Sequence, residues 1–454
     1  MGQRHRDHGE RGVSPDGLVA LVCCDLGAIV RGRAVTAASL PEHVRAGVGW
    51  VPANHALTPL GPIAAGDPFG STGDLRLAPD AGTRMRVEPL EAARELPGAA
   101  LDLMLCDIVE LDGSPWECCP REFLRSAARE LDAQVGLTLR ATFEHEFQLV
   151  SERPSALGFS LQALREAEPF PTLLMDALAQ AGAEPERIFA EYSDHQFEIP
   201  VGAAPALAAA DRAVVVREVV REVARRAGTR ATFTPVSDPE QAGNGVHIHL
   251  SLLDGDGRPV LYDPGRPGCL SETGERFAAG VLAHAGALSA LTAPSPVSAA
   301  RLAPHHWSAG AVCLAERNRE ALLRIPPLVS LGGAEPAAQM RLEYRGADAA
   351  ANPYLALGAI IRAGLEGIRR ELPAPPVLDR DPALLDGDEA ERFGVGALPA
   401  SLTAAMDTLD GDETARGWLS PLLLAAYRAV KLAEIEAAAG MVDESVYERY
   451  AAIY

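Results

Sequence analysis

The sequence has 454 residues, 48% of them hydrophobic, which is enough for a large core and for two or more structural units. Its formal net charge of −21 argues against nucleic acid as a partner, because phosphate contacts require a basic surface. Seven cysteines without a CxxC motif indicate free thiols, and no apolar run is long enough to cross a bilayer, so we expect a cytoplasmic protein with no membrane partner.

The N-terminal part predicts a small mixed domain behind a polar tail. Residues 1–15 are expected to form a disordered tail, and residues 16–112 carry short apolar runs between turn residues. Strands are expected at 18–22 and 100–111, with turns at 71–74 and 78–80. The second domain, 113–454, is expected to begin within 113–120, ahead of a helix that starts at Pro120.

The second domain alternates strand and helix patterns, and its C-terminal third is expected to be helical. The predicted helices cover 121–135, 168–184, 204–227, 272–292 and 354–370, and a loop is expected at 371–398. The predicted strands cover 137–150, 231–236, 246–253, 320–325 and 339–345.

Two histidines lie two residues apart in the apolar run 246–251. In a strand, His247 and His249 would point to the same face, with the apolar side chains on the other. Two neutral imidazoles on one strand face can offer nitrogen to a divalent cation or a phosphate. Taken alone, the pattern favours a polar strand face with two satisfied histidines and no ligand.

Carboxylates strengthen the metal hypothesis. Glu144 and Glu146 share a strand face between two phenylalanines, so the pair is not a simple solvated edge and needs nearby cations. Further glutamates on strand positions are Glu191, Glu198 and Glu343, and the sequence also supplies the arginines Arg301, Arg319, Arg324, Arg341 and Arg345. Hard oxygens with one nitrogen suit Mg²⁺ or Mn²⁺ better than zinc, and two such ions beside arginines form a clamp for phosphoryl transfer.

Five sequence blocks in this order resemble the glutamine synthetase family, over about residues 16 to 454. They are Glu144-His145-Glu146-Phe147; Glu191 to Glu198; Gly243 to Ser251; Asn318-Arg319 with Arg324-Ile325-Pro326; and Arg341 to Arg345 followed by Asn352-Pro353. The resemblance implies an α+β fold, with a small β-grasp N-terminal domain and a larger catalytic domain that has a curved antiparallel sheet and helices. It also implies a homo-oligomeric ring, usually a dodecamer, with active sites shared between neighbouring subunits.

The resemblance also assigns roles, with ATP and two Mg²⁺ or Mn²⁺ ions per site. One ion would be held by Glu146, Glu191 and Glu198, and the other by Glu144, His247 and Glu343. ATP would contact Glu186, His249, Ser251, Arg319 and Arg324, and L-glutamate would contact Gly243, Arg301, Arg319 and Arg345. Glutamate would attack the γ-phosphate of ATP to give γ-glutamyl phosphate, with Arg301 and Arg324 also catalytic, and an amine would then displace phosphate.

Departures from the family pattern concern the ammonium site. Trp307 occupies the position of a flap glutamate, the segment after Gly49-Trp50 lacks the family's aspartate, and no ammonium-binding tyrosine is identifiable in 159–176. An indole in place of anions favours a larger amine with apolar surface, which Trp307 would contact and for which His305 or His306 would be the base.

Two further positions differ from the family pattern, and several substrates and functions remain open. His195 stands where the family has a glycine, and Ala242 where it has an asparagine. Polyamines, ethanolamine, short alkylamines and aromatic amines all remain open as substrates. A true glutamine synthetase that uses ammonium and a non-catalytic homologue are the alternatives.

Overall fold

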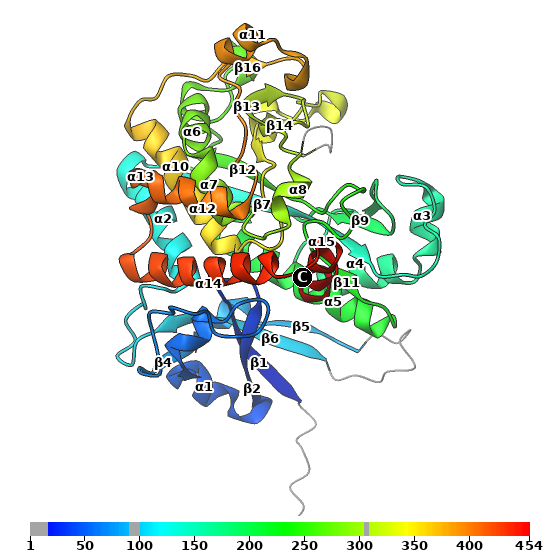
Figure 1. Ribbon diagram of the computed structural model, residues 1–454, viewed down its shortest axis with the longest axis vertical. Coiled ribbons are helices and arrows are strands. Elements are labelled where there is room, and N and C mark those ends of the chain that lie inside the picture. The colour runs from blue at the N-terminus through cyan, green and yellow to red at the C-terminus, as the bar shows by residue number, and fades with distance from the viewer. Residues whose placement is uncertain (1–16, 90–99, 304–307) are drawn as a thin grey trace, which may run out of the picture.

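The computed structural model describes residues 17–89, 100–303 and 308–454 (Figure 1). The predicted tail at 1–15 therefore lies outside the described residues, as do His305, His306 and Trp307. None of the described helices is long and apolar enough to cross a membrane.

A small sheet of six strands occupies the lower part of the molecule in Figure 1. Its strands are β1 (Leu18–Cys24), β2 (Val30–Thr36), β3 (Val48–Trp50), β4 (Leu75–Pro79), β5 (Met85–Val87) and β6 (Leu101–Val109). The order is β2-β1-β6-β4-β3, with β5 also paired to β6 and α1 (Leu40–Ala46) packed against β4. The strand predictions at 18–22 and 100–111 are confirmed. The turn predicted at 78–80 is wrong, because Ala78 and Pro79 end β4 and pair with Asp107 and Cys106 of β6.

A curved sheet of ten strands forms the frame of the larger part. Its strands are β7 (Thr138–Leu149), β8 (Phe189–Ala190), β9 (Gln196–Ile199), β10 (Ala204–Pro205), β11 (Ala231–Thr232), β12 (Val246–Leu253), β13 (Ala311–Glu316), β14 (Ala321–Ile325), β15 (Leu342–Tyr344) and β16 (Val377–Leu378). The main order is β16-β13-β14-β15-β12-β7-β9-β8. The central pairs are antiparallel as expected, but β13 runs parallel to both β14 and β16.

Helices cover the sheet around a buried central helix, α10 (Pro353–Arg369), which packs on α2 (Pro120–Val135) and α6 (Glu272–Ala283). Asn352 caps α10 by accepting from the amides of Tyr354 and Leu355. A Cβ on Gly280 would lie 2.0 Å from the carbonyl oxygen of Ala363, so α6 approaches α10 at backbone contact only because glycine stands there.

The remaining helices follow in chain order. They are α3 (Leu161–Glu166), α4 (Phe170–Gln180), α5 (Ala206–Arg226), α7 (Ala285–Thr292), α8 (Ser298–Arg301), α9 (Pro336–Gln339), α11 (Gly387–Arg392), α12 (Leu402–Gly411), α13 (Glu413–Arg416), α14 (Pro421–Ala439) and α15 (Asp443–Ile453). The helical prediction for 272–292 is confirmed, and the structure divides this segment into two helices, α6 and α7, that meet at His284. The loop predicted at 371–398 contains β16 and α11.

The two parts meet at the loop after β1, where α14 lies across the interface in Figure 1. The amide of Asn352 donates to the carbonyl oxygens of Cys24 and Asp25, and Arg217 donates to the carbonyl oxygen of Ala28. The hydroxyl of Tyr454 donates to the carbonyl of Gly27 at 2.7 Å, so the end of α15 also fastens this loop. Buried hydrogen bonds from the helices of the larger part thus hold the loop after β1 of the small domain.

Candidate active site

A cavity of about 570 Å³ lies over the middle of the large sheet. The pairing register gathers its polar side chains: His247 on β12 lies opposite Glu144 on β7, and His249 lies opposite Glu343 on β15. Arg324 on β14 extends this row, because it lies opposite Glu343. The residues predicted for the site that line this cavity are Glu144, Glu146, Glu191, Glu198, Gly243, His247, His249, Arg301, Arg319, Arg324, Glu343 and Arg345.

The first group of possible ligands is Glu146, Glu191 and Glu198, whose nearest oxygens lie within 4.8 Å of one another. Glu146 and Glu198 are directly opposite on β7 and β9, and like charges in that position are destabilising. Burial raises the pKa of Glu198 to about 10, with the charges of Glu144, Glu146 and Glu191 adding to the effect. Burial, followed by the charge of Glu146, raises the pKa of Glu191 to about 7. A divalent ion held by these three carboxylates would offset their mutual repulsion.

The second group contains Glu144, His249 and Glu343, and Glu144 also joins Glu198 and His247 in a third group. The Nδ1 atom of His247 lies 3.9 Å from Glu144 and 4.0 Å from Glu343, so the histidine assigned to the second ion faces both of its assigned carboxylates. Burial, reinforced by Arg345, holds the pKa of His247 well below its usual value, which leaves the ring neutral as a ligand must be.

His249 is as close to this group as His247. Its Nε2 lies 3.0 Å from Glu144, and its Nδ1 accepts a hydrogen bond from Arg341 at 3.0 Å. This bond fixes the ring proton on Nε2, facing Glu144. The assignment of His249 to ATP contact, and not to the second metal ion, therefore stays a prediction.

Arginines lie beside the possible metal ligands in the same cavity. Arg324 pairs with Glu343 at 2.6 Å, and Arg345 pairs with the other oxygen of the same carboxylate. Burial alone would raise the pKa of Glu343, but the positive charges of Arg345 and Arg324 hold that pKa far below its usual value. This carboxylate therefore stays ionised, as a ligand for a hard cation should.

Buried Arg301 and the loop that precedes β12 complete the floor. Arg301 donates to the carbonyl oxygen of Ala347 at 2.8 Å. The amide of Gln196 donates to the carbonyl of Gly243 at 3.0 Å, and the amide N–H of Gly245 donates to Glu146 at 2.6 Å. A Cβ on Gly243 would lie 2.1 Å from the carbonyl oxygen of Pro235, so this position requires glycine.

Two predicted ATP contacts do not line the cavity. Ser251 shares the strand face of the histidines but lies further along β12, with its hydroxyl 3.5 Å from the carbonyl oxygen of Met340. The side chain of Glu186 is about half exposed and lies 3.5 Å from Arg187. Both assignments stay predictions.

Several lining residues have no specific role in the sequence predictions, although Arg341 is named there among the arginines of the phosphoryl clamp. Arg187 lies 3.9 Å from Glu144, and Arg341 positions His249. At the mouth, Phe159 and Tyr192 are 56% and 63% exposed and give the cavity an aromatic rim. Phe159 has φ of 58°, a left-handed conformation that is unusual for an aromatic residue and that clusters at functional sites. A sequence signal existed only for Arg341, which is two residues before Glu343 and so on the same strand face.

The donor set fits two hard divalent cations. Oxygens outnumber nitrogens, sulfur is absent from the three groups, and the carboxylates of Glu146 and Glu198 lie on directly opposite strand positions, where a divalent ion would offset their repulsion. The arginines beside the groups suit phosphate and carboxylate ligands, which they can bind in a bidentate manner.

Known proteins resemble this chain in sequence. A γ-glutamylpolyamine synthetase, GlnA3 of Streptomyces coelicolor, is 36% identical over 444 residues, which are 95% of this chain and 92% of that protein. The glutamine synthetase of Methanocaldococcus jannaschii is 30% identical over 342 residues, which are 73% of this chain and 74% of that protein.

Solved structures agree in fold over the whole chain. A crystal structure described as a novel glutamine synthase homolog has a TM-score of 0.89 at 47% identity and covers 98% of this chain and 100% of its own. A GmaS/ADP complex has a TM-score of 0.78 at 26% identity and covers 94% of this chain and 95% of its own.

Two family models divide the chain between them. The glutamine synthetase N-terminal domain matches residues 2–116, and the glutamine synthetase catalytic domain matches residues 117–450. On these matches, the chain belongs to the glutamine synthetase family.

Proposed function

We propose that this protein is an ATP-dependent ligase that joins L-glutamate to an amine other than ammonia and forms a γ-glutamylamide. The observation that carries the proposal is the cavity over the large sheet, in which two groups of possible metal ligands face arginines beneath an aromatic rim. The resemblance to a γ-glutamylpolyamine synthetase over 95% of the chain supports the same reaction class.

The metal ligands would be those that the sequence predicts. Glu146, Glu191 and Glu198 would hold one divalent ion, and Glu144, His247 and Glu343 the other. When bound, the two ions would offset the carboxylate charge and withdraw charge from the transferring phosphoryl group.

The arginines would position both substrates and stabilise the charge that develops. Arg301 and Arg345 would bind the glutamate carboxylates beside Gly243, and Arg319 and Arg324 would contact the phosphates of ATP. The γ-carboxylate oxygen attacks the γ-phosphorus of ATP, ADP leaves, and γ-glutamyl phosphate forms. The amine nitrogen then attacks the carbonyl carbon of γ-glutamyl phosphate, phosphate leaves with the electrons of the C–O bond, and the nitrogen gives up a proton, for which His305 or His306 is our candidate acceptor.

Three features favour an amine larger than ammonium. Trp307 replaces a flap carboxylate, the segment at Ala53-Asn54 lacks an aspartate, and Phe159 and Tyr192 put aromatic surface at the mouth of the cavity. An ammonium ion offers no apolar surface to such a rim, whereas the carbon chain of an alkylamine can pack against it.

Assembly is part of the same proposal. We infer domains at 16–112 and 113–454 and a homo-oligomeric ring, a dodecamer, in which the small domain of one subunit completes its neighbour's site. The family models support the division, since they meet within the segment 113–120.

A true glutamine synthetase is the second candidate, because the Methanocaldococcus jannaschii glutamine synthetase is 30% identical. Phosphate release from ATP, measured with glutamate and either ammonium or a panel of amines, separates the two. We expect faster release per enzyme with an amine than with ammonium at equal concentrations of the unprotonated form. Release with ammonium alone would favour the second candidate.

A further inference from the structure

His195 lies in the turn between β8 and β9, at a position where the backbone favours glycine. Its φ is 52°, in the left-handed region that residues with a Cβ adopt at a cost in free energy. The family that this sequence resembles has glycine here, and glycine would adopt the same conformation without that cost. The contacts of the imidazole are therefore expected to offset the strain, and the reaction proposed above makes no use of them.

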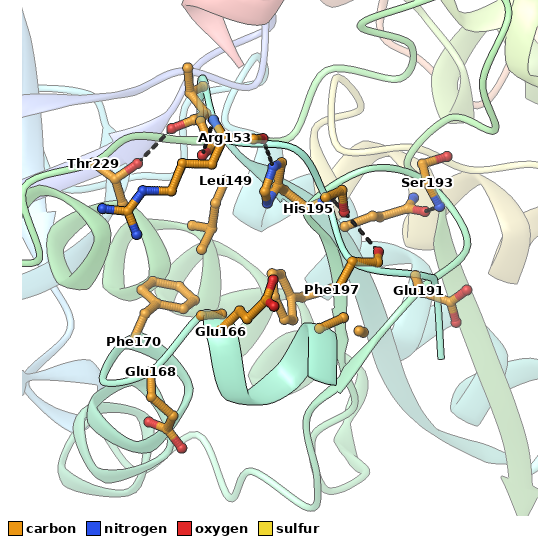
Figure 2. A pocket seen from close by; sticks show the side chains of 18 of the residues that line it. Leu149, Arg153, Glu166, Glu168, Phe170, Glu191, Ser193, His195, Phe197 and Thr229 are labelled. Atoms are coloured by element: carbon orange, nitrogen blue, oxygen red, sulfur yellow. Dashed lines mark hydrogen bonds between the residues drawn. The ribbon is translucent and has the colours of Figure 1, made fainter. Parts of the chain in front are cut away.

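The contacts of His195 are with residues 151–159, which follow β7 and which we call the mouth loop. The amide N–H of His195 donates to the hydroxyl of Ser155 at 3.1 Å, and its Nε2 donates to the carbonyl oxygen of Arg153 at 2.8 Å. Figure 2 shows the ring of His195 reaching the backbone beside Arg153. Within the described part of the chain, these two are the hydrogen bonds that tie the mouth loop to a segment that does not adjoin it.

A cavity of about 500 Å³ separates the mouth loop from the helices α3 and α4 (Figure 2). Its lining includes Arg153, Ser155 and Gly158 of the loop and His195 of the turn. The mouth loop therefore rests on little packed protein, and most of its residues are exposed. A segment with few packed contacts opens at little cost in free energy, so the bonds from His195 decide how firmly the loop is held.

The mouth loop and the turn each supply one ring of the aromatic rim of the candidate site. Phe159 comes from the loop and Tyr192 from the turn. Gly158 packs on the turn so closely that a Cβ there would lie 2.6 Å from the carbonyl oxygen of Glu191, a possible ligand of the first metal group. The bonds from His195 hold these two segments together, so they also fix the spacing of the two rings.

We propose that His195 is a positioning residue for acceptor choice, because it fastens the mouth loop to the turn and so sets the width of the aromatic mouth. The inference rests on the proposed ligase function. Without the imidazole, the mouth loop would move away from the turn, and an organic amine would lose apolar contact with Phe159. Ammonium has no apolar surface and would lose nothing.

The test compares wild type with His195→Gly, which removes the imidazole and the backbone strain together. The matched control is Glu371→Gly, where φ is 50° at an exposed residue outside the lining of the candidate site. We expect both variants to unfold near the wild-type midpoint, because glycine suits both positions. Cleavage by chymotrypsin after Leu157 or Phe159, which are 84% and 56% exposed, reports on the mouth loop without requiring ligase activity.

We expect chymotrypsin to cut the mouth loop about fivefold faster in His195→Gly than in wild type or the control, the effect of losing one hydrogen bond. In steady-state phosphate release, KM for the preferred organic amine should rise by a similar factor in His195→Gly. Its kcat and its KM for ammonium should not change, a split that a general loss of structure would not give.

Equal cleavage of His195→Gly and wild type overturns the fastening. Faster cleavage with an unchanged ratio of organic-amine KM to ammonium KM overturns the role in acceptor choice and leaves the ligase proposal standing. Wild-type protein that releases no phosphate with ammonium or any amine overturns the ligase proposal and the role in acceptor choice together, whereas the cleavage rates still decide whether His195 fastens the loop.

Discussion

Replacing Glu198 by glutamine should stabilise the metal-free protein, and increasingly so as the pH rises. The carboxyl of Glu198 on β9 lies directly opposite Glu146 on the neighbouring strand β7. Burial raises the pKa of Glu198 from 4.5 to about 10. Between these values the folded state keeps a proton that the unfolded state has released, so stability is present at low pH and is lost as the pH rises from 4.5 towards 10. At pH 7.5 this carboxyl costs about 4 kcal/mol, from three pH units at about 1.4 kcal/mol each.

The assay is thermal unfolding in chelator at pH 5.5 and pH 8 for wild type, Glu198→Gln and the exposed control Glu240→Gln. We expect the midpoint of Glu198→Gln to exceed that of wild type by several degrees at pH 8 and by much less at pH 5.5. Added Mn²⁺ should raise the wild-type midpoint most at pH 8 and should raise that of Glu198→Gln less. A wild-type midpoint that neither falls relative to Glu198→Gln as the pH rises nor responds to Mn²⁺ would refute the reasoning.

Three further results are expected. Glu343→Gln should abolish phosphate release with every amine while circular dichroism stays native, and near-normal turnover would contradict the metal assignment. Trp307→Ala should weaken the apparent affinity for the preferred amine about tenfold, the equivalent of about 1.4 kcal/mol, with little change in the apparent affinities for ATP and glutamate. Trp307→Glu should give at most a partial gain of ammonium use. An unchanged amine preference in both variants would show that Trp307 does not line the amine pocket. Light scattering should find a ring, and an active monomer would exclude shared sites.

The strands that carry the site could be read from the sequence because their patterns are locally complete. The alternation at 246–253 predicts β12 with its observed bounds, Val246–Leu253, and places both histidines on one face. Glu144 and Glu146 lie on one face of β7 for the same reason, with Phe143 and Phe147 buried behind them. The register that brings these strands together was implied by the family resemblance and not by the local pattern.

Structural features that depend on contacts between residues far apart in the chain could not be predicted from local sequence patterns. The continuous apolar pattern at 272–292 conceals the break at His284, whose Nδ1 lies 2.6 Å from Asp412 and whose ring packs on Trp418. Strand β13 was missed because its partners, β14 and β16, run parallel to it, and β16 comes from a segment that reads as a loop.

The aromatic rim of the cavity also depends on tertiary packing and could not be predicted from local sequence patterns. Phe159 lies in a segment without strand or strong helix pattern, and only the packing of Gly158 against the 191–192 backbone brings its ring to the mouth. The sequence at 159–176 predicts that the family's ammonium-binding tyrosine is absent, but it does not predict that Phe159 lines the cavity.

Acceptor choice is the most direct test of the central claim. Purified wild-type protein, with ATP, Mg²⁺ and L-glutamate, would be given ammonium and each amine in separate reactions, and the glutamyl product would be identified by mass. The account predicts a γ-glutamylamide of an organic amine as the main product, with kcat/KM for that amine at least tenfold above that for ammonium. Glutamine as the main product, at a kcat/KM that no amine exceeds, would contradict it.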